Sequence, residues 1–365
     1  MNIKKMGNGL DQIIQEDLNQ IIDSLGELFG VLAGRTILIT GANGFLASYL
    51  VDTVLGLNKT LLLEKPARVI ALTRRPTEQN NRLVHLMGDP NLIFLNADVA
   101  QPFEIPVGID YIIHAASLAS PKDYFSRPID TINANTLGTK ILLDYAVKNP
   151  LKGFLFISSA EVYGNPDINH IPIREDYFGN VNPIGPRSIY QESKRFGETL
   201  CYAFWKSFNV PAKIVRCFHT YGPRMNLNDG RAIPDYMRKG FKGEDIELGE
   251  GQEFIRTYAY VADTIAAFWR VLLLGHDGEA YNVGSEEEIT IKDLAQLLVN
   301  ILDKAMKVRI VEKNNSLNIV DAPQKTTPDI SKLKNELKYS PRVNSLEQGL
   351  RRLKNWYELY GQSIS

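Results

Sequence analysis

The strongest constraint on the fold is an alternation of short apolar runs with helix-length segments between residues 35 and 218. The apolar runs are RTILIT (35–40), RVIALT (68–73), LIFLNAD (92–98), DYIIHAAS (110–117), GFLFISS (153–159) and AKIVRCF (212–218). Continuous apolar strands separated by helices predict a parallel sheet that is covered on both faces. The sequence therefore predicts a doubly wound α/β fold, in which ligands bind at the carboxyl ends of the strands.

The length and the change of pattern along the chain indicate three segments. A chain of 365 residues is long for one compact unit, and the alternation becomes irregular after TYGPRM. We expect an amphipathic helical extension over 1–33, the α/β domain over 34–222, and a smaller C-terminal portion over 223–365 that interleaves with this domain and crosses its mouth. In the extension, apolar residues recur at helical spacing: Leu10, Ile14, Leu18, Ile21, Leu25 and Leu28. Its polar face is acidic, which favours packing on the body or on a second subunit over a membrane anchor.

The composition argues against several classes of partner. With 41 basic and 42 acidic residues the net charge is −1, so we expect neither nucleic acid nor a membrane as partner. Two cysteines, Cys201 and Cys217, are too few for a disulfide framework and fit a reducing cytoplasm. No signal peptide and no apolar run of membrane-spanning length is present. The five histidines show no ligand spacing, so no metal site is predicted.

A glycine-containing turn follows the first predicted strand. ILITGANGFLASYL places Gly41, Gly44 and Ala47 where the strand meets a helix. Small residues there let the backbone approach a pyrophosphate, and the helix N-terminus supplies N–H donors and the positive end of its dipole. Such turns also simply connect strands to helices, but the surrounding βαβ pattern favours dinucleotide binding. The predicted cofactor contacts in this loop are Gly41, Asn43, Gly44, Phe45 and Leu46.

The end of the second predicted strand leaves the choice between NAD and NADP open. An acidic residue there would hold the ribose 2′-hydroxyl of NAD, but the chain has Thr73, Arg74 and Arg75. A basic pair accepts a 2′-phosphate; alternatively, an arginine stacks on adenine or lies in solvent. After the third strand, Asp98 and Val99 are expected beside adenine, and Asp98 could equally cap a helix.

A tyrosine and a lysine in YQESKR form a candidate catalytic pair. Tyr190 and Lys194 are four residues apart and hence lie on one face of a helix. A phenol titrates at about pH 10, and a nearby ammonium lowers its pKa by stabilising the phenolate. A hydroxyl at the end of the preceding strand, Ser159 or Ser158, could hold a substrate oxygen beside that phenolate. Tyr-x-x-x-Lys alone is common on surface helices, but its combination with the glycine turn and with ISS at a strand end predicts an active site.

A series of motifs extends this prediction over most of the chain. They are TGANGFLA, HAASLASP, ISSAEVYG, NPIGPRSIYQESKR, RCFHTYGPRM, FIRTYAYVADTI, YNVGS and TTPDISKLKNELKYSP. In this order they resemble the extended short-chain dehydrogenase/reductase family, specifically its nucleotide-sugar-modifying branch, over about residues 35–355. The resemblance implies a Rossmann domain that binds NAD, with NADP as the alternative, a C-terminal portion that binds a nucleotide sugar, and a homodimer formed through helices of the Rossmann domain. It also places Ala115, Ala116, Ser117, Tyr190 and Lys194 at the cofactor.

Within that branch the motifs are most similar to those of UDP-glucuronate decarboxylases, so a UDP-sugar is the favoured substrate. By resemblance the substrate-binding residues are Ser120, Tyr124, Arg187, His219, Arg224, Arg231 and Arg256. A guanidinium matches a carboxylate or a phosphate in bidentate geometry. The alternative for any single arginine, and above all for Arg231, is a salt bridge at the protein surface.

The resemblance implies a reaction through a 4-keto sugar. Tyr190 removes the proton of the 4-hydroxyl, Lys194 holds the cofactor ribose and Ser159 holds the developing carbonyl. The C4 hydride passes to the oxidised cofactor and later returns, so no cofactor is consumed. A 4-keto glucuronate is a β-keto acid and loses carbon dioxide. Glu161, which sugar decarboxylases and dehydratases share, is the catalytic candidate for chemistry at C5.

Three departures from the decarboxylase pattern keep other functions open. Ala160 stands where decarboxylases carry serine and 4,6-dehydratases carry an aspartate acid, which counts against a dehydratase. His219 replaces an asparagine, which implies either a substituted hydrogen bond or an altered substrate or pH dependence. The third departure is the basic end of the second strand. The alternatives are a 4-epimerase or a dehydratase acting on another nucleotide sugar. A catalytically silent cofactor sensor is disfavoured because the serine, tyrosine and lysine are intact.

Overall fold

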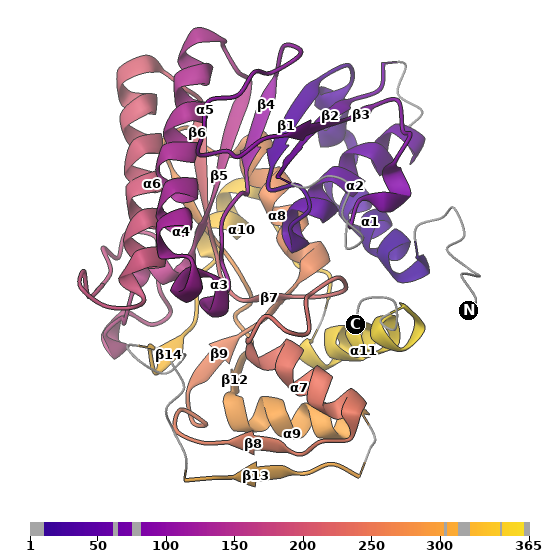
Figure 1. Cartoon of the computed structure of the whole chain (residues 1–365), viewed down its shortest axis with the longest axis vertical. Coiled ribbons are helices and arrows are strands. Elements are labelled where there is room, and N and C mark those ends of the chain that lie inside the picture. The colour runs from indigo at the N-terminus through magenta and orange to yellow at the C-terminus, as the bar shows by residue number, and fades with distance from the viewer. Residues whose placement is uncertain are drawn as a thin grey trace.

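The centre of the computed structural model is a seven-stranded parallel sheet with the order β11-β6-β5-β4-β1-β2-β3 (Figure 1). The structure describes residues 11–60, 65–74, 82–302, 305–312, 322–343 and 345–360. The strands of the sheet are β1 (Thr36–Thr40), β2 (Arg68–Thr73), β3 (Leu92–Asn96), β4 (Tyr111–His114), β5 (Gly153–Ser159), β6 (Ala212–Cys217) and β11 (Ala280–Val283). Each apolar run predicted from the sequence forms a strand here, which confirms the doubly wound α/β fold.

Helices cover both faces of the sheet because successive strand residues point to opposite sides. Leu38 packs in the apolar layer beneath α5 and α6, whereas Ile37 and Ile39 face the opposite layer, which includes α2 and α8. The helices on the first face are α4 (Pro128–Asn135), α5 (Leu137–Lys148) and α6 (Ser188–Phe208), and those on the second are α1 (Gln12–Leu25), α2 (Phe45–Thr60) and α8 (Val261–Leu274). Figure 1 shows the two layers on either side of the strands.

The N-terminal helix α1 belongs to the main hydrophobic core of its own chain. Its apolar face packs on α2 and α8. Within this core the buried Asp17 accepts hydrogen bonds from the hydroxyls of Tyr49 (3.0 Å) and Tyr260 (3.1 Å). Asp17 also pairs with Nε of Arg352 (2.9 Å), which lies on α11 (Leu346–Tyr360). One buried carboxylate thus links the N-terminal helix to the Rossmann domain and to the last helix.

The C-terminal portion forms a smaller body below the carboxyl ends of the main strands (Figure 1). Its elements are β7 (Thr220–Tyr221), α7 (Ala232–Lys242), β8 (Ile246–Leu248), β9 (Ile255–Thr257), β10 (Ala259–Tyr260), β12 (Glu288–Thr290), α9 (Ile291–Leu302), β13 (Val308–Ile310) and β14 (Lys325–Thr326). The later helix α10 (Ser331–Leu337) packs instead on α8 and β11 of the first domain. Its short strands pair β7 with β10, β8 with β13, and β9 with β12 and β14. The chain also returns to the first domain, because α8 covers the main sheet and β11 pairs with β6.

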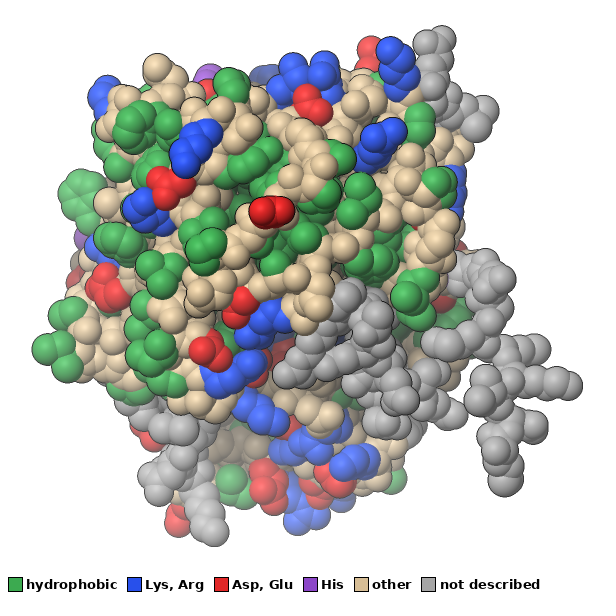
Figure 2. Space-filling model, turned by 45° about the horizontal axis from the view of Figure 1, so that its top comes forward, with side chains coloured by type: hydrophobic (Ala, Val, Ile, Leu, Met, Phe, Trp, Pro, Cys, Tyr) green, Lys and Arg blue, Asp and Glu red, His purple; other side chains and the backbone are tan. Residues whose placement is uncertain are grey.

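The remaining regular elements are short. They are α3 (Pro121–Ser126) and the 3₁₀ turns η1 (Gly26–Leu32), η2 (Val84–Leu86), η3 (Ala160–Tyr163) and η4 (Ile168–His170). Acidic and basic side chains are interspersed over the face shown in Figure 2. Among the helices that the structure describes, none is both long and apolar enough to cross a bilayer.

Candidate active site

A cavity of about 890 Å³ lies between the carboxyl ends of the main strands and the C-terminal portion. Of the residues predicted to form the site, the cavity is lined by Gly44, Phe45, Leu46, Ala115, Ser117, Ser120, Tyr124, Ser159, Glu161, Arg187, Tyr190, Lys194, His219, Arg231 and Arg256. Those outside its lining are Gly41, Asn43, Thr73, Arg74, Asp98, Val99, Ala116 and Arg224. The structure thus brings the expected catalytic residues together with most of the expected substrate residues.

The glycine loop has the geometry that a dinucleotide requires. Gly41 has φ +64°, and a Cβ at this position would lie 2.7 Å from Cα of Ala116. Only glycine therefore lets the loop pass this close to the end of β4. The Oγ1 of Thr40 accepts hydrogen bonds from the backbone N–H groups of Ala115 (3.2 Å) and Ala116 (3.1 Å) and holds the two segments together.

The same part of the cavity contains a polar atom without a partner. The hydroxyl oxygen of Ser117 is buried and makes no hydrogen bond within the part of the chain that the structure describes. A buried hydroxyl without a partner is costly, so it indicates a position where a ligand supplies the hydrogen bond. Together with the N-terminus of α2 after Gly44, this residue fits a bound dinucleotide.

The residues predicted beside adenine lie away from the cavity. Thr73 ends β2 with its side chain buried, Arg74 is exposed, and Arg75 falls outside the described residues. Asp98 accepts a hydrogen bond from the N–H of Ala100 (3.0 Å) and closes a turn, so it does not cap a helix as the alternative supposed. Val99 is buried in the core beneath α5.

Tyr190 and Lys194 project from α6 toward the end of β5. The ammonium of Lys194 donates to the carbonyl of Ile157 (2.7 Å) and lies 5.8 Å from the ring centroid of Tyr190. Tyr190 stacks on Tyr124 of α3, with ring centroids 5.4 Å apart and planes 13° apart. The α6 helix can approach β5 closely because residue 197 is glycine. A Cβ at Gly197 would lie only 2.4 Å from the ring of Phe156.

Burial is the largest influence on the pKa values of Tyr190 and Lys194. It raises the pKa of Tyr190 well above its ordinary value, and a hydrogen bond with Ser159 lowers it only in part. It also lowers the pKa of Lys194 to about 7. The expectation that Lys194 lowers the pKa of the phenol is therefore not met in this structure, because its ammonium bonds to a backbone carbonyl and desolvation dominates.

The two serines at the end of β5 have different roles. The hydroxyl of Ser158 donates to the Glu198 carboxylate (2.6 Å), which Arg216 also binds. This places Ser158 in a buried structural network, while Ser159 hydrogen-bonds Tyr190. Of the two alternatives left open by the sequence, Ser159 is thus the serine that faces the catalytic tyrosine.

Glu161 follows β5 and is held in its ionised form. Its carboxylate pairs with Arg187 and accepts a hydrogen bond from Nε2 of Gln191 (2.9 Å). Burial alone would raise the pKa of Glu161, but the attraction of Arg187 and these hydrogen bonds outweigh burial and lower it. Gln191 was not predicted; its position directly after Tyr190 in YQESKR was the signal that could have identified it.

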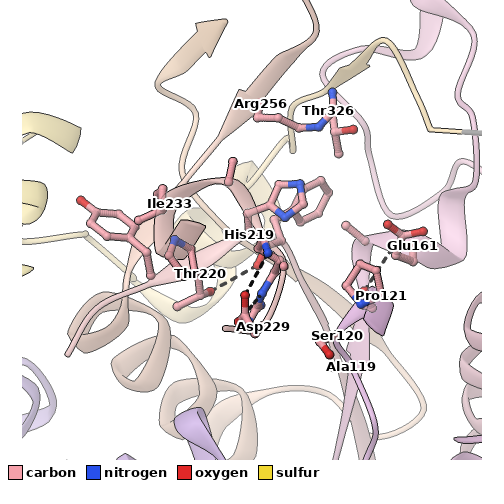
Figure 3. Close-up of a pocket in the computed structure, with 18 of the residues that line it drawn as sticks. Ala119, Ser120, Pro121, Glu161, His219, Thr220, Asp229, Ile233, Arg256 and Thr326 are labelled. Atoms are coloured by element: carbon pink, nitrogen blue, oxygen red, sulfur yellow. Dashed lines mark hydrogen bonds and ion pairs between the residues drawn. The ribbon is translucent and has the colours of Figure 1, made fainter. Parts of the chain in front are cut away.

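The far end of the cavity is basic and contains His219 and Arg256, which are labelled in Figure 3. Arg231 also lines the cavity. Burial lowers the pKa of His219 to about 3, with Arg256 as the next contribution, so its ring is neutral at physiological pH. Arg231 pairs with Asp229 through Nε (2.9 Å), which is the salt bridge given as its alternative.

Arg256 differs from Arg231 because, among the described residues, it contacts no carboxylate. Its guanidinium donates to the backbone carbonyls of Ile255 (2.8 Å), Pro323 (2.7 Å) and Gln324 (3.3 Å). The adjacent Thr326, which the sequence analysis missed, has a buried hydroxyl with no partner in the described part of the chain. A cation and an unpartnered donor here match an anionic group of a ligand.

Arg224 is directed away from the cavity. Its guanidinium pairs with Asp52 of α2 (2.5 Å) and lies over the ring of Tyr49. Asp52 is also bonded to Nε2 of His85 (2.6 Å). The predicted substrate contact is therefore not seen, because an internal carboxylate already binds this arginine.

Comparisons with known proteins identify the family of the chain. Residues 37–284 match the model of the family described as "NAD dependent epimerase/dehydratase family". UDP-glucuronic acid decarboxylase 1 of Danio rerio is 36% identical over 317 residues, which cover 87% of this chain and 71% of the relative. UDP-glucuronic acid decarboxylase 5 of Arabidopsis thaliana is 35% identical over 314 residues, or 86% of each chain.

Solved structures show the same fold. The UDP-glucuronic acid 4-epimerase from Bacillus cereus, in complex with UDP-glucuronic acid and NAD, is 25% identical with a TM-score of 0.74 and covers 89% of this chain and 100% of its own. A dTDP-glucose 4,6-dehydratase from Streptomyces venezuelae with NAD bound has a TM-score of 0.77 at 24% identity and covers 90% of this chain and 98% of its own. NAD, the cofactor in the family description, is the expected one. The chain belongs to the NAD dependent epimerase/dehydratase family.

Proposed function

We propose that the protein is an NAD-dependent decarboxylase of UDP-glucuronic acid. The observation that carries this proposal is the pairing of Glu161 with Arg187 beside Tyr190 and Ser159. One cavity thus contains a tyrosine for proton removal at C4 and an ionised carboxylate for chemistry at C5. The decarboxylases among the relatives support the proposal.

Each residue of the site has a separate role in this reaction. Residues of the glycine loop, Ser117 and Lys194 would hold NAD, which would supply a reversible hydride acceptor for C4 of the sugar. Ser159 holds the 4-oxygen beside Tyr190, which takes the hydroxyl proton, and Lys194 holds the ribose of the cofactor. The resulting 4-keto acid releases carbon dioxide because its ketone accepts the electron pair. The enolate left behind gains a proton at C5, and we assign to Glu161 the relay of this proton from solvent water to C5.

The side chain at position 160 favours decarboxylation over dehydration. Ala160 lines the cavity between Ser159 and Glu161 and carries no proton that could be given to a leaving 6-hydroxyl. Decarboxylation needs no such acid. The guanidinium of Arg256 and the hydroxyl of Thr326 favour an anionic substrate. The sugar carboxylate or the diphosphate of UDP-glucuronic acid would supply the negative charge.

A second candidate is a 4-epimerase acting on the same substrate. The solved UDP-glucuronic acid 4-epimerase from Bacillus cereus supports it, since the shared fold covers 89% of this chain and all of that one. An epimerase needs Ser159, Tyr190 and Lys194 but no group for C5 chemistry. The ionised Glu161 in the cavity therefore favours the decarboxylase.

Product analysis separates these functions. Purified protein is incubated with UDP-glucuronic acid and with a panel of UDP-, dTDP-, CDP- and GDP-sugars, and products are followed by mass spectrometry. Loss of carbon dioxide supports the decarboxylase; an unchanged mass at a new retention time indicates the epimerase, and loss of water indicates a dehydratase. Tyr190→Phe should reduce turnover by about 10²–10⁴-fold while NAD binding is retained.

We also propose a cytoplasmic homodimer formed through the α4–α5–α6 layer. This layer exposes large apolar side chains: Ile129, Leu137, Phe196, Tyr202 and Phe208. Exposed apolar side chains gathered on one layer favour burial against a second copy. Light scattering after size exclusion should give twice the mass of the chain, and Phe196→Glu should shift it to the monomer. Both cysteines are free thiols, which supports a reducing compartment.

A further inference from the structure

A second basic group, Arg82, lies beside the glycine loop and was not identified from the sequence. Its backbone N–H donates to Oδ1 of Asn43 (2.7 Å) and its Nη1 donates to the Asn43 carbonyl (2.9 Å). Its Nε donates to the carbonyl of Arg224 (3.0 Å). These bonds hold the guanidinium in one place, and the residue lines the cavity together with Gly44 and Phe45.

The charge of Arg82 is not neutralised by any carboxylate that the structure describes. The other arginines near this end differ, because Arg224 pairs with Asp52 and Arg231 with Asp229. Burial and the nearby Arg224 both lower the pKa of Arg82, which shows that its surroundings disfavour the cation. Guanidinium nevertheless stays protonated in proteins. A half-buried cation in such surroundings is stabilised when a ligand brings negative charge.

Two further features that line the same cavity suit an anionic ligand. The first turn of α2 begins at Phe45, directly after Gly44, and the first N–H groups of a helix attract negative charge. The buried hydroxyl of Ser117 lines the same cavity without a hydrogen-bond partner in the described residues. Helix N-terminus, hydroxyl and guanidinium come from three separate segments of the chain.

We propose that Arg82 binds the pyrophosphate of the dinucleotide and thereby joins the cofactor loop to the segment after β7. This inference rests on the NAD binding of the proposed function. The same side chain holds Asn43 in the cofactor loop and the Arg224 carbonyl at the start of the segment that leads to Arg231. Cofactor binding at Arg82 thus also positions the segment from Arg224 to Arg231, which leads to the substrate side of the cavity.

A role in reading the 2′-phosphate of NADP is the main competing assignment for Arg82. That phosphate binds at the end of the second strand. Arg82 instead contacts the glycine loop, and the strand-end residues Thr73 and Arg74 do not line the cavity. The geometry therefore assigns Arg82 to the phosphates that NAD and NADP share.

Binding measurements with four ligands test the proposal without relying on turnover. NAD, NADP, ADP-ribose and adenosine are titrated into wild-type protein, Arg82→Gln and Arg82→Lys by calorimetry. In Arg82→Gln the affinities for NAD, NADP and ADP-ribose should fall by about tenfold or more, and by the same factor for all three. Adenosine, which has no phosphate, should bind as before. Arg82→Lys should restore part of the loss because it restores the charge.

The matched control is Arg68→Gln, an exposed arginine at the start of β2 that lies outside the cavity. It should leave all four affinities unchanged. An equal loss for adenosine and ADP-ribose in Arg82→Gln would mean a purely structural role, and a loss confined to NADP would mean 2′-phosphate recognition; either result overturns the inference. Wild-type protein that binds no NAD would overturn the proposed function as well. Circular dichroism of each variant verifies folding.

Discussion

The half-buried carboxylate of Glu161 and the buried guanidinium of Arg187 form an ion pair at the carboxyl end of β5. Nε2 of Gln191, on the same helix as Tyr190, donates a further hydrogen bond to the Glu161 carboxylate. The pair joins a carboxylate that follows β5 to the helix that carries Tyr190. It therefore fixes the position of this carboxylate relative to Tyr190.

Glu161→Gln should block the step at C5 while C4 oxidation continues. The amide keeps the shape but removes the negative charge, so turnover should fall by about 10²–10⁴-fold. Reduced cofactor should accumulate on addition of UDP-glucuronic acid, and absorbance detects it. Because the pKa of Glu161 is lowered, the wild-type carboxylate stays ionised as the pH falls to about 5 and should not limit activity there. A variant with normal product formation would contradict this assignment.

His219→Asn should not change the shape of the pH profile between about pH 5 and 8. The burial of His219, followed by Arg256, Arg231 and Arg187, lowers its pKa to about 3 against the opposing effect of Glu161. The ring is therefore neutral throughout that range. Rates measured at saturating and at low substrate concentrations should show a changed KM. The acid and alkaline limbs of the pH profile should change little. Loss of a limb near pH 6 would show instead that His219 titrates in catalysis.

Lys194→Met should remove a pH dependence of stability from the cofactor-free protein. The folded pKa of Lys194 is lowered to about 7, whereas an unfolded lysine titrates at about 10.4. Between these values the unfolded state binds more protons, so the stability due to this group rises with pH, by about 1 kcal/mol per unit. Urea unfolding at pH 7.5 and 9.5 should show wild type gaining stability relative to the variant. An unchanged difference at the two pH values would contradict the prediction.

Arg352→Met should destabilise the protein by about 3 kcal/mol, because it leaves the Asp17 carboxylate buried without its cation. Burial already raises the pKa of Asp17 to about 6 in the presence of Arg352. A raised pKa means that this group stabilises the fold at low pH and that the benefit is lost as the pH rises through the folded pKa. The loss of stability should thus be larger at pH 7.5 than at pH 5. The control is Arg351→Met, which removes an exposed pair with Glu347 and should change little.

The parts of the fold that could be predicted from the sequence are those with strong local patterns. Strands such as β1 and β5 are buried on both faces and hence read as continuous apolar runs. The short strands β7, β10 and β14 have two residues each, and only the pairing of distant segments defines them. Their existence depends on tertiary contacts that no local pattern encodes.

The same distinction applies to the site. Tyr190, Lys194 and Ser159 were predicted because helical spacing and a strand end place them together. Arg82 follows a stretch without periodicity, and its position depends on Asn43 and the Arg224 carbonyl far away in sequence. Arg224 was predicted as a substrate contact, but Asp52 of α2 competes for its charge. When a charged side chain pairs with a residue far away in the sequence, local residue spacing does not predict that partner.

The pairing of β11 with β6 determines how the molecule can open. The chain leaves the first domain, builds the opposite wall of the cavity and then returns to the edge of the main sheet. Several crossings of the chain therefore tie the wall formed by the C-terminal portion to the main sheet and limit how far the two can separate. Such a closed frame suits an enzyme that keeps its cofactor from one turnover to the next.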